Sequence, residues 1–420
     1  MDVSKLSVAT PSETETFRDA GIKSVLKAQA ASPEQIARAI NALEARLADI
    51  AGMATILRVD FDDENTIYID GGARRIVDPQ PAHGRIAVHP DEFRRIVTGI
   101  QDVRHAMLLN LARVGGDIPS VTRFCDQLGG RVGHSSIAED AVLPVATTDR
   151  EQARRDLAQF GYCLVKDALS PEQLARLRAR LVEQAAAEAE AGVATFDGLK
   201  GSNNPPNQKV WALQNKGAEF LELLKNPLIE EFAAELLGPY FTISHYLANI
   251  AGPGGEPQFL HQDQVGIQPL MDDFPVGLNM LWFLDDVCEA NGGTRVCPAS
   301  HLTHNAPDNP FVSDGTVAAE GPAGTALLFD SRLWHGTGAN TTDKKRHAII
   351  SYFYRNWMRP QINPFATVRP EIAATFDDQL KILHGYRCTN AHGGRERQIE
   401  GEMISLDPQL LGREMHLASH

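Results

Sequence analysis

The segment EPQFLHQDQVGIQP, residues 256–269, places His261 and Asp263 two residues apart in an otherwise apolar run typical of a buried strand. Successive side chains of a strand point to opposite faces, so these two residues would project side by side on one face. Burying two polar groups is costly unless they are compensated by a partner. The pair therefore predicts a partner that both side chains share.

A second chemical feature lies in LLFDSRLWHGTGANTTDKKRHAIISYFYRN, where His335 follows one predicted strand and Arg346 begins the next. If the turn-rich connection folds as a hairpin centred on Asn340 and Thr341, His335 and Arg346 lie nearly opposite each other. A guanidinium that is always charged would then sit beside an imidazole.

Two histidines and one carboxylate, two of them from one strand and the third from a distant strand, form a facial triad. This arrangement leaves coordination positions open and is the geometry preferred by non-haem Fe(II) oxygenases. Arg346 adds a planar fork that suits a bidentate carboxylate, as a 2-oxo acid cosubstrate would require. The four residues predict a site at which iron, cosubstrate and oxygen meet.

The H-x-D pattern alone is weak, because VHPDEF at residues 88–93 also contains it through His89 and Asp91. There Pro90 stands where a helix would begin, and Asp91 falls in the first helical turn. An acidic residue in that turn complements the helix dipole, so a structural interpretation is preferred for this second pair.

The composition limits the classes of protein to consider. A chain of 420 residues is too long for one ordinary core, so two domains are expected. A formal charge of −14 disfavours nucleic acid or an anionic membrane as general partners. Five cysteines without a C-x-x-C pair suggest neither a disulfide framework nor a zinc site and fit a cytoplasmic protein. We expect no signal peptide and no transmembrane segment.

The first part of the chain predicts a small α+β unit. The phrase SPEQ at residues 32–35 and again at 170–173 is a capping box that begins an amphipathic helix in each place. Residues 54–72 alternate as a hairpin, and RIAVHP is a strand followed by helices near Asp91–Gly99 and Val103–Val114. We expect an N-terminal domain over 1–130, a linker over 131–148, and a second domain with a C-terminal extension over 149–420.

The second domain changes from helices to many short strands, a pattern typical of a sandwich or barrel. The expected strands cover residues 241–250, 257–266, 276–285, 294–298, 324–330 and 346–355.

From about Asp149 to Tyr386 the chain resembles the phytanoyl-CoA dioxygenase family of iron(II)/2-oxoglutarate oxygenases. The similar stretches are FGYCLVKDALSPEQLARL, KVWALQNKGAEF, LHQDQ, LNMLWFLDDVCEANGGTRVCPASH, LWHGTGANTTDKKRHAI and NWMRPQINP. The resemblance implies a double-stranded β-helix, a jelly-roll barrel with flanking helices. It also implies Fe(II), 2-oxoglutarate and O2 as cofactor and cosubstrates. Its metal ligands fall on His261, Asp263 and His335, and its residue for the far carboxylate of 2-oxoglutarate falls on Arg346.

The same resemblance suggests further residues for the cosubstrate pocket. Trp282 would lie near the cosubstrate, and Thr337 stands where the family has the serine of HGS; barrel core and a turn cap are their alternative roles. Asn249 and Lys209 could face the pocket, although buried hydrogen bonding or a solvated surface would explain them equally well. Because Asp263 is present, hydroxylation, desaturation or rearrangement is implied, and not the halogenation of relatives that lack this carboxylate.

Residues of about 33–128 resemble the sterol carrier protein type 2 domain, an α+β fold with an apolar tunnel. This similarity lies in TILRVDFDDENTIYIDGG and RIAVHPDEFRRIVTGIQDVRHAMLLNLARVGGDIPSVTRF. It implies that the domain holds or delivers an apolar substrate. The alternative is that the tunnel is closed and the domain covers the barrel or forms a homodimer.

The resulting hypothesis is a dioxygenase that hydroxylates a small, hydrophobic or carrier-linked metabolite and releases succinate and CO2. One alternative is a non-catalytic lipid- or metabolite-binding protein on the same barrel. Another is a metal-dependent isomerase or hydrolase, in which Arg346 would have no evident purpose. Four histidines without a partner at ligand spacing are interpreted as structural or surface groups, namely His245, His301, His304 and His384.

Overall fold

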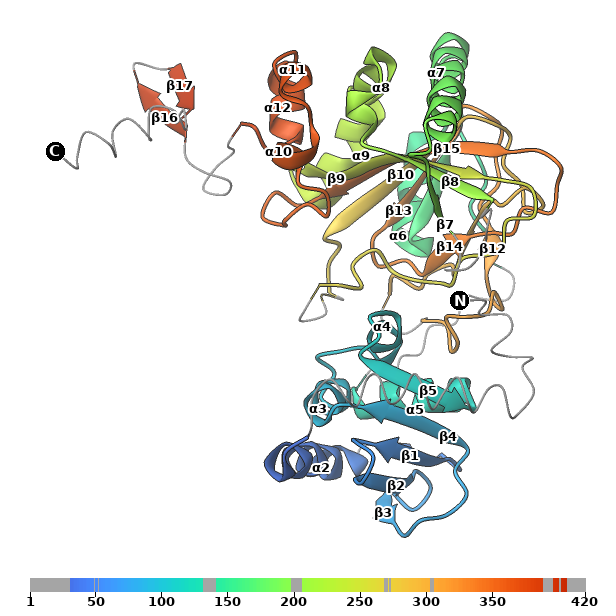
Figure 1. Ribbon diagram of the computed structural model, residues 1–420, viewed down its shortest axis with the longest axis vertical. Coiled ribbons are helices and arrows are strands. Elements are labelled where there is room, and N and C mark those ends of the chain that lie inside the picture. Colours follow the sequence, from blue (N-terminus) through green and yellow to red (C-terminus); the bar gives the residue numbers. More distant parts are fainter. Residues whose placement is uncertain are drawn as a thin grey trace.

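The structure of the protein is a computed structural model with two main parts (Figure 1). One hydrophobic cluster is drawn from residues 36–128, and a larger and a smaller one are drawn from residues 141–386. The residues that the structure describes are 31–48, 50–51, 53–130, 141–197, 206–267, 271, 273–302, 306–387, 396–399 and 402–405.

The N-terminal part, residues 31–130, is built on a five-stranded sheet with the order β3-β2-β1-β4-β5. β1 pairs antiparallel with β2 and parallel with β4, and β4 pairs antiparallel with β5. The strands are β1 (Ile56–Asp60), β2 (Thr66–Asp70), β3 (Arg75–Val77), β4 (Gly84–Val88) and β5 (Ala112–Gly116). The helices are α2 (Pro33–Leu47), α3 (Pro90–Val97), α4 (Val103–Leu108) and α5 (Ile118–Leu128).

Most local predictions for this part are confirmed. The SPEQ segment at residues 32–35 forms a complete capping box, as does its counterpart at 170–173 in the C-terminal part, and residues 54–72 contain the antiparallel pair β1–β2. His89 caps α3 through its Nδ1 atom, which accepts from the backbone amide of Asp91. The helix expected to continue to Val114 ends instead at Leu108. Asn110 adopts a left-handed φ of 63°, which stops the helix and lets β5 begin.

The C-terminal part is organised by a seven-stranded antiparallel sheet with the order β6-β13-β10-β15-β9-β8-β7. Long apolar strands form its centre, and all seven residues of β10 are buried, which indicates that both faces of the sheet are covered. Its strands are β6 (Tyr162–Val165), β7 (Thr195–Asp197), β8 (Asn207–Trp211), β9 (Thr242–Ala251), β10 (Gly277–Phe283), β13 (Ala326–Asp330) and β15 (Arg346–Tyr354).

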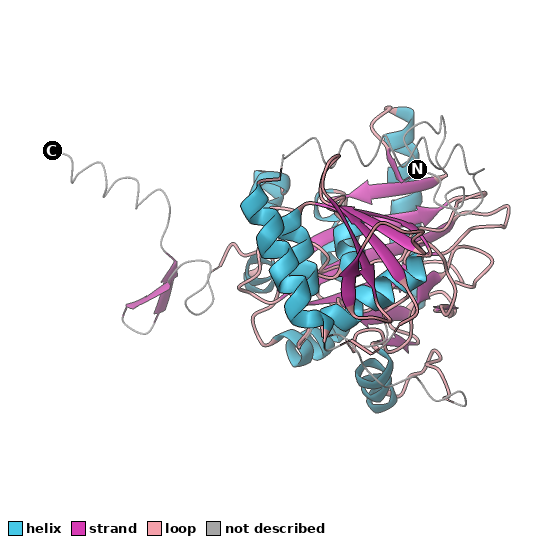
Figure 2. Ribbon diagram, turned by 90° about the horizontal axis from the view of Figure 1, so that it is seen from below, coloured by secondary structure: helices cyan, strands magenta, loops and turns pink. Residues whose placement is uncertain are grey.

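Helices cover one face of this sheet, and a smaller sheet covers the other (Figures 1 and 2). The smaller sheet has the order β12-β11-β14, with β11 (Thr294–Val296), β12 (Val317–Ala318) and β14 (His335–Thr337). The helices are α6 (Arg150–Phe160), α7 (Pro171–Glu190), η2 (Leu213–Asn215), α8 (Ala218–Leu223), α9 (Pro227–Leu237), α10 (Pro364–Thr367), α11 (Pro370–Ala373) and α12 (Asp378–Leu383). The site described below lies between the two sheets.

Two predictions about the strands are wrong. Residues 257–266 do not form a continuous strand: His261 makes an isolated bridge to His335, and turns follow from Asp263 onward. The hairpin that would pair His335 with Arg346 does not form. β14 pairs with β11 in the small sheet, whereas β15 pairs with β9 and β10 in the large one. The connection crosses between sheets, and within it the Asn340 side chain donates to the backbone carbonyl oxygens of Ala251, on β9, and Lys344.

Beyond these two parts, β16 (Glu396–Ile399) and β17 (Glu402–Ser405) form a two-stranded antiparallel sheet. None of the described helices is both long enough and apolar enough to cross a membrane.

Candidate functional site

His261, Asp263 and His335 meet between the two sheets. The backbones of the two histidines exchange a pair of 2.9 Å hydrogen bonds, which place their rings side by side with centroids 4.4 Å apart. Each Asp263 carboxylate oxygen lies 3.7 Å from one histidine Nε2 atom. The potential ligand atoms of all three residues lie within 4.8 Å of one another. This is the donor set and spacing that a metal ion of the non-haem iron type requires.

Backbone carbonyl groups orient both imidazoles. His261 Nδ1 lies 3.2 Å from the carbonyl oxygen of Phe259, and His335 Nδ1 lies 2.9 Å from that of Leu333. Because a carbonyl oxygen can only accept, each Nδ1 carries the proton and each Nε2 presents its lone pair to the shared centre. Such partners of metal-binding histidines fix the tautomer and the ring direction.

Burial sets the protonation of this group. It lowers the pKa of His261 to about 4, an effect increased by the neighbouring His335, and it lowers the pKa of His335 to about 4 as well. Both imidazoles are therefore neutral at pH 7, which is the form that binds metal. Burial raises the pKa of Asp263, whereas nearby histidines and a hydrogen bond from Asn279 Nδ2 act in the opposite direction.

Arg346 reaches the same interior from β15. It is only 2% exposed, and its Nη2 atom donates to the carbonyl oxygen of Gly292. Its Nε atom has no hydrogen-bond partner, and no carboxylate among the described residues forms an ion pair with it. Burial lowers the pKa of Arg346 to about 10, which still leaves the group charged at pH 7. Asp285 acts on this cation only from beyond ion-pair distance, and a buried cation without an ion-pair partner among the described residues fits a carboxylate ligand.

Asn249 and Thr337 connect the arginine strand with the histidine strand. Asn249 lies opposite Ala348 on β15, two residues along from Arg346, and its Nδ2 atom donates to Thr337 Oγ1 over 3.1 Å. The buried Asn249 Oδ1 atom has no hydrogen-bond partner. Arg346 Nε and Asn249 Oδ1 are thus two buried polar atoms without a hydrogen-bond partner in this region. Such atoms are expected in the pocket of a polar cosubstrate.

The structure does not bring Trp282 into this interior, which corrects its prediction as a cosubstrate contact. Asn279 lies opposite Tyr352, on the face that also carries Arg346, whereas Trp282 lies opposite Ile349 and points to the helix-covered face. Its indole is fully buried there and donates to Ser351 Oγ. Trp282 is core, the alternative role considered for it.

His245, interpreted from the sequence as a structural or surface group, lies near the triad, and so does Lys209. His245 is on β9, its Nδ1 atom lies 2.9 Å from Gln361 Oε1, and burial lowers its pKa. Its charge and that of Lys209 act on Asp263, so both side chains are near the triad. The spacing of His245 and Asn249, four residues apart on an apolar strand and hence on one face, was the available signal.

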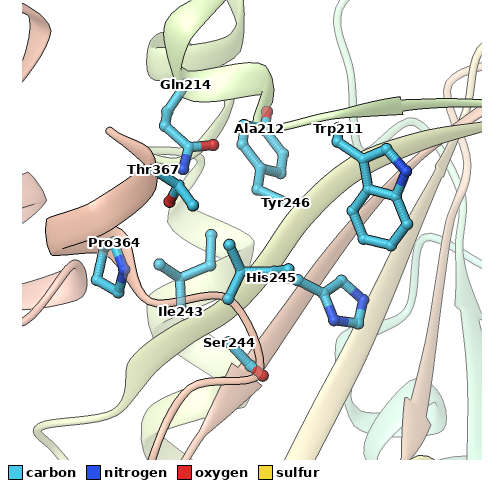
Figure 3. Close-up of a pocket in the computed structure, with 10 residues that line it drawn as sticks. Trp211, Ala212, Gln214, Ile243, Ser244, His245, Tyr246, Pro364 and Thr367 are labelled. Carbon is cyan, nitrogen blue, oxygen red and sulfur yellow. The ribbon is translucent and has the colours of Figure 1, made fainter. Parts of the chain in front are cut away.

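A cavity of about 160 Å³ adjoins His245 (Figure 3). Trp211 and His245 lie at one end of it, and Gln214 and Thr367 lie at the other. The walls are mainly apolar. Gln214 is 5% exposed, and its Oε1 atom has no hydrogen-bond partner, so one polar acceptor is available in an apolar cavity.

Comparisons with known proteins agree with this chemistry. Residues 157–348 match the phytanoyl-CoA dioxygenase family. The dioxygenase af480 of Aspergillus fumigatus is 33% identical over 243 residues, which are 56% of this chain and 77% of that protein. The dioxygenase FUM3 of Gibberella moniliformis is 30% identical over 49% of this chain and 72% of its own.

Among solved structures, AviO1 from Streptomyces viridochromogenes is 23% identical, with a TM-score of 0.42 over 50% of this chain and 96% of its own. The non-heme alpha ketoglutarate dependent carbocyclase SnoK is 20% identical, with a TM-score of 0.42 over 55% of this chain and 95% of its own. From the sequence matches and the site, the chain belongs to the phytanoyl-CoA dioxygenase family and is an iron(II)- and 2-oxoglutarate-dependent dioxygenase.

Proposed function

We propose that this dioxygenase binds Fe(II) through His261, Asp263 and His335 and the far carboxylate of 2-oxoglutarate through Arg346. Its reaction is the hydroxylation of a small, hydrophobic or carrier-linked metabolite, with release of succinate and CO2. The observation that carries the proposal is the buried guanidinium of Arg346, which forms no ion pair with any carboxylate that the structure describes and faces the same interior as the triad.

Each residue of the site has a distinct task in this proposal. The two histidines present neutral Nε2 atoms, and Asp263 supplies negative charge that offsets the charge of the metal. Asn279 holds one oxygen of the Asp263 carboxylate and so fixes its direction. When bound, iron and 2-oxoglutarate supply the oxidising chemistry that the side chains cannot perform.

Three polar side chains between the triad and β15, those of Arg346, Asn249 and Thr337, orient the cosubstrate. Arg346 provides a planar pair of donors at a fixed position, and Asn249 and Thr337 line the path from it to His335. The site is buried between two sheets, so few water molecules compete for these donors.

The cavity beside His245 supports an apolar substrate. Its size and mainly apolar walls suit a compact hydrocarbon body, and Gln214 Oε1 would accept a hydrogen bond from one hydroxyl or amide of that substrate. Replacing Gln214 with Leu should then weaken the binding of substrates that carry this donor and spare those that lack it.

We also propose the domain arrangement expected from the sequence, with an N-terminal domain over 1–130, a linker over 131–148 and an oxygenase domain with a C-terminal extension over 149–420. The separate hydrophobic clusters of the two parts support this division. Two facing antiparallel sheets are consistent with a double-stranded β-helix in the second domain. The likeness of residues 33–128 to a sterol carrier domain stays a prediction.

The test is formation of succinate from 2-oxoglutarate in the presence of Fe(II), O2 and a panel of small apolar alcohols, acids and acyl thioesters. We expect at least one class of compound to stimulate succinate formation by wild type and not by Asp263→Ala. Asp343→Ala, which removes an exposed aspartate, serves as the matched control. An iron-loaded wild type that binds a compound tightly without ever forming succinate would favour the non-catalytic binding protein.

A further inference from the structure

The N-terminal part contacts the C-terminal part directly behind the two histidines. Leu260 and Trp334 precede His261 and His335 in the chain, and they are 2% and 1% exposed. Because neighbouring side chains of extended segments point to opposite sides, these two residues face away from the triad. They form a small hydrophobic cluster with Cys297, against which Leu108 of α4 packs.

An aromatic contact strengthens this junction. The ring of His105, on α4, lies with its centroid 5.4 Å from that of Trp334 and is tilted by 35°. Both residues are 1% exposed. Since Trp334 and His335 are adjacent in the chain, α4 buttresses the segment that carries His335. In Figure 1, α4 is the part of the N-terminal unit nearest to the large sheet.

A second junction supports the segment that carries His261. Arg104 Nε donates to the carbonyl oxygen of Pro307, and Thr122 Oγ1 donates to that of Asp308, both over 2.6 Å. Two residues further on, the carbonyl oxygen of Pro310 accepts a 2.7 Å hydrogen bond from the backbone amide of Leu260. The N-terminal part thus holds a loop that in turn holds the residue before His261.

The holding groups are themselves fixed within the N-terminal part. Arg104 is 1% exposed and makes a bidentate contact with Asp126, with distances of 2.8 and 2.7 Å, and a longer one with Asp102. Burial alone would lower the pKa of Arg104, but the nearby carboxylates, chiefly Asp126 and Asp102, outweigh it and raise the pKa. A planar guanidinium held on two sides has little freedom, so its donor to Pro307 has a defined position.

The histidine segments need such support, because little regular structure surrounds them. β14 is three residues long, and His261 is joined to His335 by an isolated bridge. On its other side β14 pairs with β11 over three residue pairs, so one short strand anchors the two histidine backbones. Contacts from behind add a second anchor.

We propose that the N-terminal part is a positioning domain for the metal centre and that His105, Arg104 and Thr122 are its positioning residues. This inference rests on the proposed metal site. It assigns the domain a role that needs neither a lipid cargo nor a second copy of the chain. Disturbing the junction should weaken metal binding while the fold of the oxygenase part survives.

The test compares full-length wild type with His105→Ala and Thr122→Val, each stripped of metal and titrated anaerobically with Co(II) while its visible ligand-field bands are recorded. Loss of outer partners of metal ligands typically lowers metal affinity 10- to 100-fold, and we expect about tenfold for each variant. We also expect faster hydrogen exchange at the Leu260 amide. His105→Phe, which keeps a ring against Trp334, should restore most of the affinity.

Thr98→Val is the matched control, because Thr98 Oγ1 donates to the carbonyl oxygen of Arg94 within the N-terminal part. Its Co(II) affinity should stay within about twofold of wild type, well short of the loss expected for a disturbed outer partner. If His105→Ala fails to fold, the nearly isosteric Thr122→Val decides the question. Folded variants with wild-type affinity and spectra would overturn the positioning role alone. A wild type that binds no Co(II) or Fe(II) would overturn the metal site and this inference together.

Discussion

Replacing Arg346 with methionine should have opposite effects on cosubstrate binding and on the stability of the free protein. The guanidinium is buried and has one backbone acceptor, with its Nε atom unpaired. Burial lowers its pKa to about 10, and this departure from the ordinary arginine value corresponds to about 3 kcal/mol of unfavourable free energy for the buried charge. Methionine keeps an unbranched chain and removes that charge.

The loss of cosubstrate affinity follows from the hydrogen bonds to the carboxylate. A bidentate contact consists of two charge-assisted hydrogen bonds of about 1.5–3 kcal/mol each, so a loss of roughly 3–5 kcal/mol is expected. This corresponds to about a hundredfold to several thousandfold in the dissociation constant of 2-oxoglutarate. The free energy of unfolding without ligand should stay unchanged or rise by about 1–3 kcal/mol, because an unpaired buried charge is removed.

The assay combines urea unfolding of the metal-free protein with an anaerobic 2-oxoglutarate titration of the Fe(II)-loaded protein. Arg355→Met is the matched control, because Arg355 donates to the backbone carbonyls of Pro275, Leu236 and Leu237 just beyond the same strand. This control should lose stability and keep its affinity for 2-oxoglutarate. If Arg346→Met instead loses more than about 2 kcal/mol of stability and binds 2-oxoglutarate normally, the arginine is structural and the reasoning is refuted.

Three further outcomes are expected. Asn279→Ala should lower Fe(II) affinity about tenfold or more by freeing the Asp263 carboxylate, which a competitive metal titration would measure; an unchanged affinity would contradict that role. Because burial lowers the pKa of His261 and His335 to about 4, protons compete with metal only as the pH falls toward that value. Metal affinity should thus be nearly constant from pH 8 to 6 and drop below about pH 5, and a drop centred near the ordinary histidine value of 6.5 would contradict it. Arg104→Met should lower the free energy of unfolding by about 3–5 kcal/mol in urea denaturation, since it removes the guanidinium partner of the buried Asp102 and the partly buried Asp126 carboxylates, whereas a change under 1 kcal/mol would show that they reorganise freely.

The chemistry of the site was more predictable than its architecture. His261 and Asp263 project to the same side wherever the backbone between them is extended. Their spacing therefore predicted their proximity, although the expected strand over 257–266 does not form. In its place, Gln262 Nε2 donates to the carbonyl oxygen of Arg332, and turns follow from Asp263. Side chains here satisfy backbone groups that a continuous strand would have paired, and periodicity does not reveal this.

Long-range arrangement explains the other differences. A hairpin between His335 and Arg346 was reasonable on turn chemistry, but the connection passes from one sheet to the other, which local sequence does not specify. The position of Trp282 was ambiguous because every residue of β10 is buried and no alternation marks its faces. The polar residue Asn279 indicates which face of β10 points toward the site. Trp282, three residues further along the strand, lies on the opposite face.

The measurement that tests the central claim most directly is an anaerobic titration of metal-free protein with Fe(II) and 2-oxoglutarate, comparing wild type with His335→Ala. We predict a weak visible charge-transfer band that requires both additions and is lost in the variant. If folded, iron-loaded wild type shows no band at saturating 2-oxoglutarate, then the triad and Arg346 do not form a 2-oxoglutarate site, and the account is contradicted.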